Sequence, residues 1–256
     1  MVTLSVCIEV IFRELPFLDR MDAVAEAGFT AFEFWGWRPK DIEGILKRKE
    51  ERGLEVSAFC VDPMGRIVDY NTKHEFIAGV KDSIDVARKL DCSRLIVTAG
   101  NEIEGVPRKK QHRNIVRCLK QAARLVRKAD VTLVLEPLNI LVDHRGYYLY
   151  SSGEGFEILR EVASPNVKLL YDVYHQQITE GNLIDTITKN IDLIGHFHTA
   201  DVPGRHELGT GEINYANVFK KIDELGYDGF VGLEFMPSTD PGEALEKVAG
   251  IRACTD

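Results

Sequence analysis

The sequence predicts an α/β fold, a single (β/α)8 or TIM barrel that spans residues 1–256. Three observations predict it. Short apolar, β-branched runs alternate with longer amphipathic stretches, the alternation repeats eight times in about 250 residues, and no linker or low-complexity segment divides the chain. The alternative is a doubly wound open sheet. It fits less well, because no Gly-x-Gly-x-x-Gly motif follows the first expected strand and more than five or six strands are expected.

The expected strands are short, mainly apolar runs with β-branched residues. They cover residues 3–12, 31–36, 54–60, 93–100, 131–139, 167–175, 194–201 and 230–235.

The expected helices show apolar residues at helical spacing, and several end at a glycine that can form a C-cap. They cover residues 17–29 with a cap at Gly28, 41–53 with a cap at Gly53, 74–90, 114–129 and 215–229 with a stop at Gly226. A last helix follows Pro241 and is expected to be short or incomplete.

The charge balance argues against nucleic acid as a partner. The formal net charge is -8, and non-specific binding to nucleic acid needs a basic surface. The densest basic run, residues 108–113, is expected to open a polar helix and face solvent. No apolar stretch approaches eighteen residues, so no membrane span is expected.

The five cysteines are Cys7, Cys60, Cys92, Cys118 and Cys254. Their number is odd and no Cys-x-x-Cys pair occurs, which favours reduced thiols and a cytoplasmic location. The N-terminus carries Glu9 and no basic segment, so it does not have the pattern of a signal peptide.

Four residues that can bind a metal ion stand at the ends of four consecutive expected strands: Glu136, Asp172, His198 and Glu234. In a barrel, the carboxyl ends of the strands meet at one face, where active sites lie. Three clustered carboxylates raise one another's pKa values, and a divalent cation removes that cost. Oxygen and imidazole ligands suit Mn²⁺ or Mg²⁺ best, with Co²⁺ or Zn²⁺ as further possibilities.

Simpler interpretations exist for each residue taken alone. A glutamate at the end of a strand often forms a salt bridge, and His196 and His198 share one face of their strand, where a histidine is often a core residue. The joint pattern at matching strand ends is what favours a metal site.

Aromatic residues follow the early strands and could form an apolar wall of a pocket. They are Phe12, Trp35, Trp37 and Phe59. We take Trp35 as a candidate substrate contact; the alternative for the group is packing between loops or a subunit interface.

At these residues the chain resembles a known family. Similar segments are residues 17–34, 135–139 (LEPLN), 171–177 (YDVYHQQ), 195–201 (GHFHTAD), 209–215 (GTGEINY) and 227–235. They resemble the hydroxypyruvate isomerases, within the xylose-isomerase-like barrels that also include the ketose 3-epimerases. The resemblance covers nearly the whole chain.

The resemblance implies the same four metal ligands, and it implies that Glu136 and Glu234 also act as the acid/base pair. It places His175 against the substrate and Arg205 on a substrate oxygen or carboxylate, a task for which the planar guanidinium is suited. Glu33 would line the pocket; a buried structural ion pair is the alternative.

Three departures bear on the substrate. Hydroxypyruvate isomerases often have Gln where this chain has His198, and the third strand ends in Phe59–Cys60 instead of a His–Asn pair. Asp143, in the loop after the fifth strand, matches the family's acidic residue only roughly.

The expected activity is isomerisation of a small α-hydroxycarbonyl compound, hydroxypyruvate or a related oxo-acid or ketose, by proton transfer through an enediolate. The alternatives are a ketose 3-epimerase, a metal-dependent nuclease of the AP endonuclease type, and a non-catalytic binding protein. Family members tend toward dimers or tetramers, so a homo-oligomer is an expectation as well.

Overall fold

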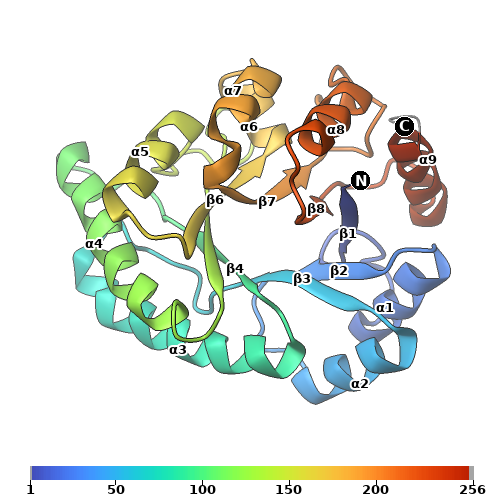
Figure 1. Ribbon diagram of the computed structural model, residues 1–256, viewed down its shortest axis with the longest axis horizontal. Helices are drawn as coiled ribbons and strands as arrows, with labels where there is room; N and C mark the ends of the chain where they lie inside the picture. The colour runs from blue at the N-terminus through green and yellow to red at the C-terminus, as the bar shows by residue number, and fades with distance from the viewer. Residues whose placement is uncertain (1, 254–256) are drawn as a thin grey trace.

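The β-strands close into a parallel barrel in which β1 lies beside β8 (Figure 1). The computed structural model describes residues 2–253. Each strand pairs with its neighbours in chain order, and Thr3 to Val6 of the first strand align with Phe230 to Leu233 of the last. The strands are β1 (Thr3–Cys7), β2 (Ala31–Phe34), β3 (Glu55–Cys60), β4 (Arg94–Thr98), β5 (Thr132–Glu136), β6 (Val167–Asp172), β7 (Ile194–Thr199) and β8 (Phe230–Leu233). The predicted fold class is confirmed.

Helices surround the barrel and cover its outer face (Figure 1). Within residues 2–253 they are α1 (Phe17–Glu26), α2 (Ile42–Arg52), α3 (Lys73–Leu90), α4 (Arg108–Val126), α5 (Ser152–Val162), α6 (Val173–Thr179), α7 (Leu183–Asn190), α8 (Tyr215–Glu224) and α9 (Pro241–Ala253), with 3-10 turns η1 (Tyr70–Thr72) and η2 (Ile191–Leu193). Gly53 caps α2 in the left-handed conformation, as expected.

Several predicted boundaries are corrected. β1 ends at Cys7 because the backbone N–H groups of Val10 and Ile11 turn back to its carbonyl oxygen. β6 ends at Asp172, because that side chain begins α6 as its N-cap. The last helix is longer than expected and runs from Pro241 to Ala253.

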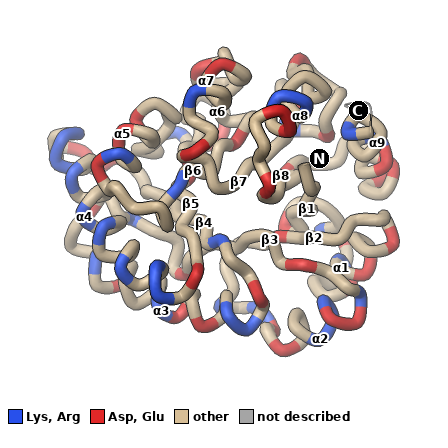
Figure 2. Tube along the Cα trace, viewed as in Figure 1, with Lys and Arg blue, Asp and Glu red and all other residues tan. Residues whose placement is uncertain are grey.

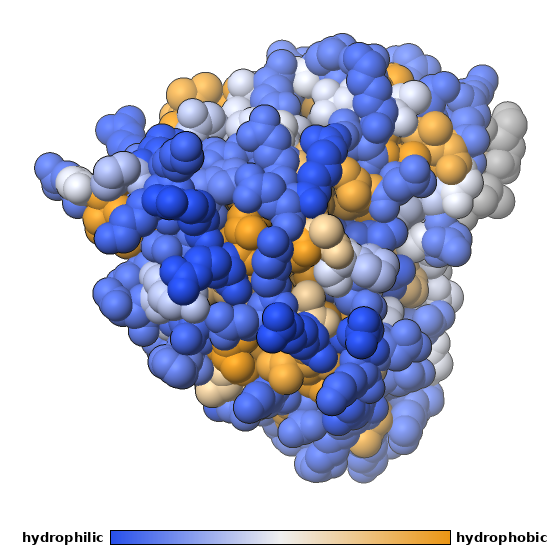
Figure 3. Space-filling view, turned by 60° about the vertical axis from the view of Figure 1, so that its left-hand side comes forward, coloured by the Kyte–Doolittle hydropathy of each residue, from blue (hydrophilic) through white to orange (hydrophobic). Residues whose placement is uncertain are grey.

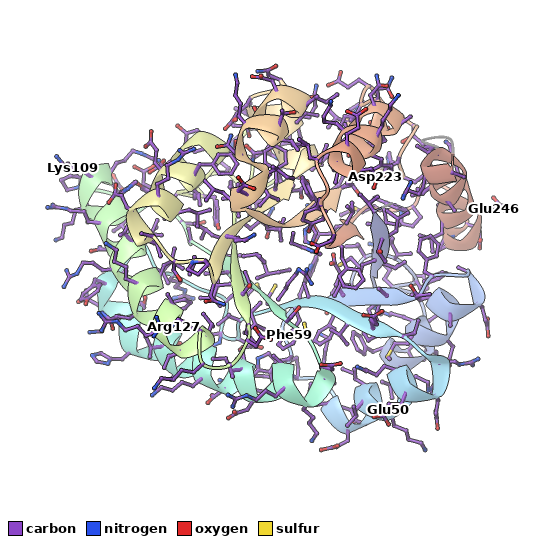
Figure 4. All side chains as sticks on the ribbon, viewed as in Figure 1. Glu50, Phe59, Lys109, Arg127, Asp223 and Glu246 are labelled. Atoms are coloured by element: carbon purple, nitrogen blue, oxygen red, sulfur yellow. The ribbon has the colours of Figure 1, made fainter. Side chains whose placement is uncertain are left out.

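Strand alternation sorts side chains between the barrel interior and the layer beneath the helices. A small cluster of Ala58, Cys60, Ile96, Val134 and Leu170 is separate from the main core and lies on the inward face of β3 to β6. Phe59, next to Cys60, points the other way and stacks on Phe34 with ring centroids 5.2 Å apart. Figure 4 shows Phe59 among the strands, whereas Glu50, Lys109 and Glu246 extend outward.

Charged residues lie mainly on the outer helices. Lys and Arg are dense along α4 in Figure 2, which agrees with the expected polar face. Arg108 at its start contacts Glu102 and Glu154. The side of the molecule that carries α4 is largely hydrophilic in Figure 3. Within the described residues, no helix has the length and apolar character needed to cross a membrane.

Cys7, Cys60, Cys92 and Cys118 are buried and free of disulfides, as predicted. Cys254 lies outside the described residues.

Candidate active site at the carboxyl ends of the strands

The period-two alternation of the strands brings the four candidate ligands together. In β5 and β6, Val134 and Leu170 point inward, so Glu136 and Asp172 two residues later do as well. His198 lies near the end of β7. Glu234 follows β8 directly, and its backbone N–H donates to the carbonyl oxygen of Thr199 at 3.0 Å.

Ligand atoms of these four residues all lie within 4.8 Å of one another, and all four side chains are buried. His198 Nδ1 is 3.3 Å from Glu136 Oε1 and 3.5 Å from Glu234 Oε2. Among the described residues, this nitrogen has no hydrogen-bond partner. A buried, unpartnered imidazole nitrogen that faces carboxylates is what a divalent cation site requires, so the residues fit such an ion.

The protein shifts the pKa values of the three carboxyls in different directions. Burial raises the pKa of Asp172 to about 6. Burial also raises the pKa of Glu136, and nearby Glu234 and Asp172 add to this effect while His198 opposes it. Burial acts in the same sense on Glu234, but Arg205 and His198 outweigh it and lower its pKa. Two glutamates that face one site therefore differ in their tendency to hold a proton.

Asp172 uses its two oxygens for different tasks. Oδ1 accepts from the backbone N–H groups of Tyr174 at 2.8 Å and His175 at 3.2 Å, which caps α6. Oδ2 is left to face the cluster, 3.5 Å from His175 Nε2. The cap therefore fixes the direction of the free carboxylate oxygen.

Both oxygens of Glu234 are held from outside the cluster. Trp35 Nε1 donates to Oε1 at 2.8 Å, and Arg205 Nη2 donates to Oε2. Arg205 comes from the loop after β7 and has a positive φ of 57°, a left-handed backbone uncommon for a residue with a side chain. Trp35 and Arg205 thus lie beside the cluster, and their predicted contact with a substrate stays a prediction.

His175 lies in a hydrogen-bonded network behind Asp172. Its Nδ1 accepts from Asn139 Nδ2 at 2.7 Å, and the Asn139 amide also donates to Asp143 at 2.7 Å. Tyr174 donates to the same Asp143 oxygen at 2.9 Å. With Nδ1 as acceptor, the neutral ring carries its proton on Nε2, which has no partner among the described residues. The ring is fully buried, and burial lowers its pKa. The predicted contact of His175 with a substrate stays a prediction.

The structure corrects the expectation that Glu33 lines the pocket. Its side chain is 1% exposed and lies below His198 inside the barrel. Oε1 is 2.8 Å from His198 Nε2, and Oε2 is 2.8 Å from His196 Nε2. Burial tends to raise the pKa of Glu33, but the two imidazoles lower it to about 2. The alternative interpretation, a buried ion pair, is the one that the contacts match.

A cavity of about 190 Å³ opens above the cluster. Glu136, His198, Glu234, Arg205 and Trp35 line it. The lining residues that sequence reasoning missed are Cys60, Met64, Ile96, Thr98, Leu138 and His144.

The predicted aromatic wall is reduced to Trp35. Trp37 is not among the lining residues and donates from Nε1 to Ser83 Oγ at 2.9 Å, and Phe59 packs outside the barrel on Phe34. Phe12 is packed against the hydrophobic core. The apolar side of the cavity is formed mainly by aliphatic and sulfur-containing side chains.

A second, larger cavity of about 290 Å³ lies at the amino ends of the strands, between Arg94, Lys168, Asp192 and Asp228. Its charges are mixed. Among residues 2–253, two groups of side chains could hold a metal ion, and both lie elsewhere: Glu136, Asp172, His198 and Glu234, and the deeper Glu33, His196 and His198. We therefore place the candidate active site at the other end.

The chain is similar to known proteins over nearly its whole length. A family model described as xylose isomerase-like TIM barrel matches residues 21–254. Hydroxypyruvate isomerase of Escherichia coli K12 is 33% identical, with 93% of this chain and 95% of that protein covered. 2-oxo-tetronate isomerase of Cupriavidus necator is 31% identical, with 93% and 94% covered. The solved structure of an AP endonuclease, family 2, from Brucella melitensis superposes with a TM-score of 0.93 at 30% identity, covering 98% of this chain and 99% of that one.

Proposed function

The chain belongs to the family of xylose isomerase-like TIM barrels and is an enzyme of the isomerase type, and we propose that it interconverts a small 2-oxo acid and its α-hydroxy aldehyde or ketone isomer. The observation that carries the proposal is the pairing of Glu136 and Glu234 about His198, at the base of a cavity sized for a small substrate. The named activities of the two relatives concern small hydroxy-oxo compounds.

We further propose that Glu136, Asp172, His198 and Glu234 hold a divalent cation, Mn²⁺ or Mg²⁺, since three carboxylates and one imidazole form a hard donor set. When bound, such an ion polarises a substrate carbonyl and makes the neighbouring C–H proton more acidic.

The two glutamates then divide the proton transfer. Glu234 is held ionised by Arg205 and is the base that takes the proton from the hydroxyl-bearing carbon. Glu136, whose pKa burial raises, returns a proton to the former carbonyl carbon of the enediolate, and the proton taken up by Glu234 passes to Glu136 through solvent before the next turnover. The hydroxyl proton passes to the former carbonyl oxygen, so the net change moves hydrogen between two adjacent carbons.

Other residues orient the substrate and limit water. Arg205 lines the cavity and offers guanidinium N–H groups beyond the two used on Glu234, which suits a substrate carboxylate. Ile96, Leu138 and Cys60 form an apolar side that strengthens the charged contacts opposite.

The test is product analysis in D₂O. Protein loaded with Mn²⁺ is incubated with hydroxypyruvate, with a dihydroxylated four-carbon 2-oxo acid and with D-fructose, and the products are followed by NMR after the Mn²⁺ is removed. We expect isomerisation of an oxo acid with deuterium at the newly protonated carbon. EDTA should abolish turnover, and Mn²⁺ or Mg²⁺ should restore it.

Glu136→Gln and Glu234→Gln should each lower the rate by about 10²- to 10⁴-fold, the usual contribution of a positioned acid or base. Glu246→Gln, the same change on the exposed face of α9, is the control. Full activity after chelation would exclude the cation. A wild-type rate in either site variant would exclude the acid/base assignment.

Two other activities are outcomes of the same screen. Inversion of a ketose at C3, with exchange at that carbon alone, would identify an epimerase, for which the two glutamates would act from opposite faces. Cleavage of DNA at an abasic site would instead match the activity for which the Brucella melitensis protein is named. The net charge of -8 and the single histidine in the four-residue cluster favour the isomerase.

A further inference from the structure

We propose that Glu33 is a positioning residue, which holds the His198 imidazole by Nε2 so that Nδ1 faces the cation site. The inference rests on the proposed function, because it takes Glu136, Asp172, His198 and Glu234 as the cation ligands. It assigns to Glu33 a role in cation affinity in place of contact with substrate.

The first step is the orientation of the imidazole. His198 Nδ1 faces Glu136 and Glu234 at 3.3 and 3.5 Å, whereas Nε2 faces Glu33 Oε1 at 2.8 Å. The two ring nitrogens therefore face different carboxylates, which lie on opposite sides of the ring. A histidine that binds metal through one nitrogen usually donates from the other to a carboxylate, which fixes the tautomer and the ring plane.

The contact is close but not aligned as a hydrogen bond. Neither His198 Nε2 nor Glu33 Oε1 has a hydrogen-bond partner of good geometry among the described residues. Contacts in active sites are often poorly aligned before the ligand is bound and tighten afterwards. The separation of 2.8 Å already brings the two atoms into reach.

The second step is the support of Glu33 itself. Its other oxygen, Oε2, accepts from Ser57 Oγ at 3.1 Å and lies 2.8 Å from His196 Nε2. Ser57 Oγ is in turn 2.5 Å from Ser5 Oγ. All of these side chains are buried, so turning the carboxylate away from His198 would also break its contacts below.

The third step comes from β8, the strand paired with β7, where Gly232 is in register with His198. Gly232 of β8 lies against the pair, and a Cβ at this position would clash with Glu33 Oε1 and come within 2.7 Å of His198 Cδ2. The φ of Gly232 is not positive, so a need for left-handed backbone does not explain the glycine. The absence of a side chain leaves the space in which Glu33 and His198 meet.

The experiment separates the effect of the length of the Glu33 side chain from the effect of its charge on Mn²⁺ affinity. Mn²⁺ affinity is measured by titration calorimetry on the full chain, and thermal melting reports the fold. Glu33→Asp keeps the charge and withdraws the oxygens from His198, whereas Glu33→Gln keeps the length and removes the charge. Ser83→Ala, a buried serine of α3 whose hydroxyl bonds Trp37 and neither Glu33 nor His198, is the control.

If Glu33 positions His198, Glu33→Asp weakens Mn²⁺ binding about 10- to 100-fold, the range seen when the partner of a metal-bound histidine is lost. Glu33→Gln, whose amide oxygen can still accept from Nε2, loses less, and Ser83→Ala keeps the wild-type affinity. Wild-type affinity in Glu33→Asp, or a loss confined to Glu33→Gln, would overturn the positioning role. Failure of the wild-type protein to bind Mn²⁺ would instead overturn the proposed cation site, and this role with it.

Discussion

Trp35 donates its indole N–H to Glu234 Oε1 at 2.8 Å, so a residue after the second strand contacts the carboxylate after the eighth. The contact crosses β1, which lies between β2 and β8 in the closed barrel. Arg205 holds the other oxygen from the loop after β7. Glu234 is therefore positioned by two donors from different parts of the chain.

Trp35→Phe should lower kcat/KM about 10- to 100-fold, because a hydrogen bond to a charged group contributes roughly 1.5–3 kcal/mol. The melting temperature should change little, since Trp35 is 38% exposed. Trp37→Phe is the matched control: its indole N–H bonds Ser83, away from the cavity. Equal activity of the two variants would show that the Trp35 contact does not support catalysis.

Gly232→Ala should destabilise the protein by about 1–3 kcal/mol, the usual cost of adding a methyl group to a packed interior. The reason is the clash with Glu33 and His198. Gly250→Ala, in α9 with open space around its Cα, should instead stabilise by about 0.5–1 kcal/mol through helix propensity. Urea unfolding curves measure both. An unchanged free energy of unfolding in Gly232→Ala would contradict the predicted clash.

The lowered pKa of Glu154 predicts that the free energy of unfolding depends on pH. Burial tends to raise its pKa, but donors on Tyr148, His112 and Arg108 outweigh this and lower it. A carboxyl whose pKa is lower in the folded state adds stability above its unfolded pKa, and this stability is lost as pH falls through the folded pKa.

Glu154→Gln should therefore unfold more easily than wild type at about pH 6, and the difference should shrink toward about pH 3.5. Urea unfolding across this range measures it. Glu157→Gln, an exposed glutamate of the same helix, should show no such trend. A difference that stays constant with pH would contradict the assignment of stability to the Glu154 charge.

Much of the fold and of the cluster could be predicted from the sequence, because strand alternation and the shared carboxyl end of a parallel barrel are properties of local pattern. The inward positions of Glu136, Asp172, His198 and Glu234 follow from these two rules. Boundaries were harder, because they depend on individual hydrogen bonds. The turn after Cys7 and the cap formed by Asp172 are not visible in hydropathy.

The position of Glu33 and the cavity lining depended on tertiary contacts. Glu33 stands near the end of an apolar strand like the true cluster residues, and only its depth, beneath His198, separates it from them. Met64, Leu138 and His144 reach the cavity from loops that carry no motif. Strand alternation could have predicted that only one of Phe59 and Cys60 faces the barrel interior, since neighbouring strand residues point to opposite faces. Cys60 is the residue that lines the cavity.

The pairing of β1 with β8 also governs when activity can arise during synthesis. Glu136, Asp172 and His198 are made before Glu234, and Trp35 is made long before the carboxylate that it contacts. A nascent chain that has not yet released its eighth strand from the ribosome holds an incomplete set of acid groups and an open seam. With the proposed acid/base role of Glu234, turnover would report that β1 and β8 have paired, and a chain truncated before β8 is expected to be inactive even if the rest of it folds.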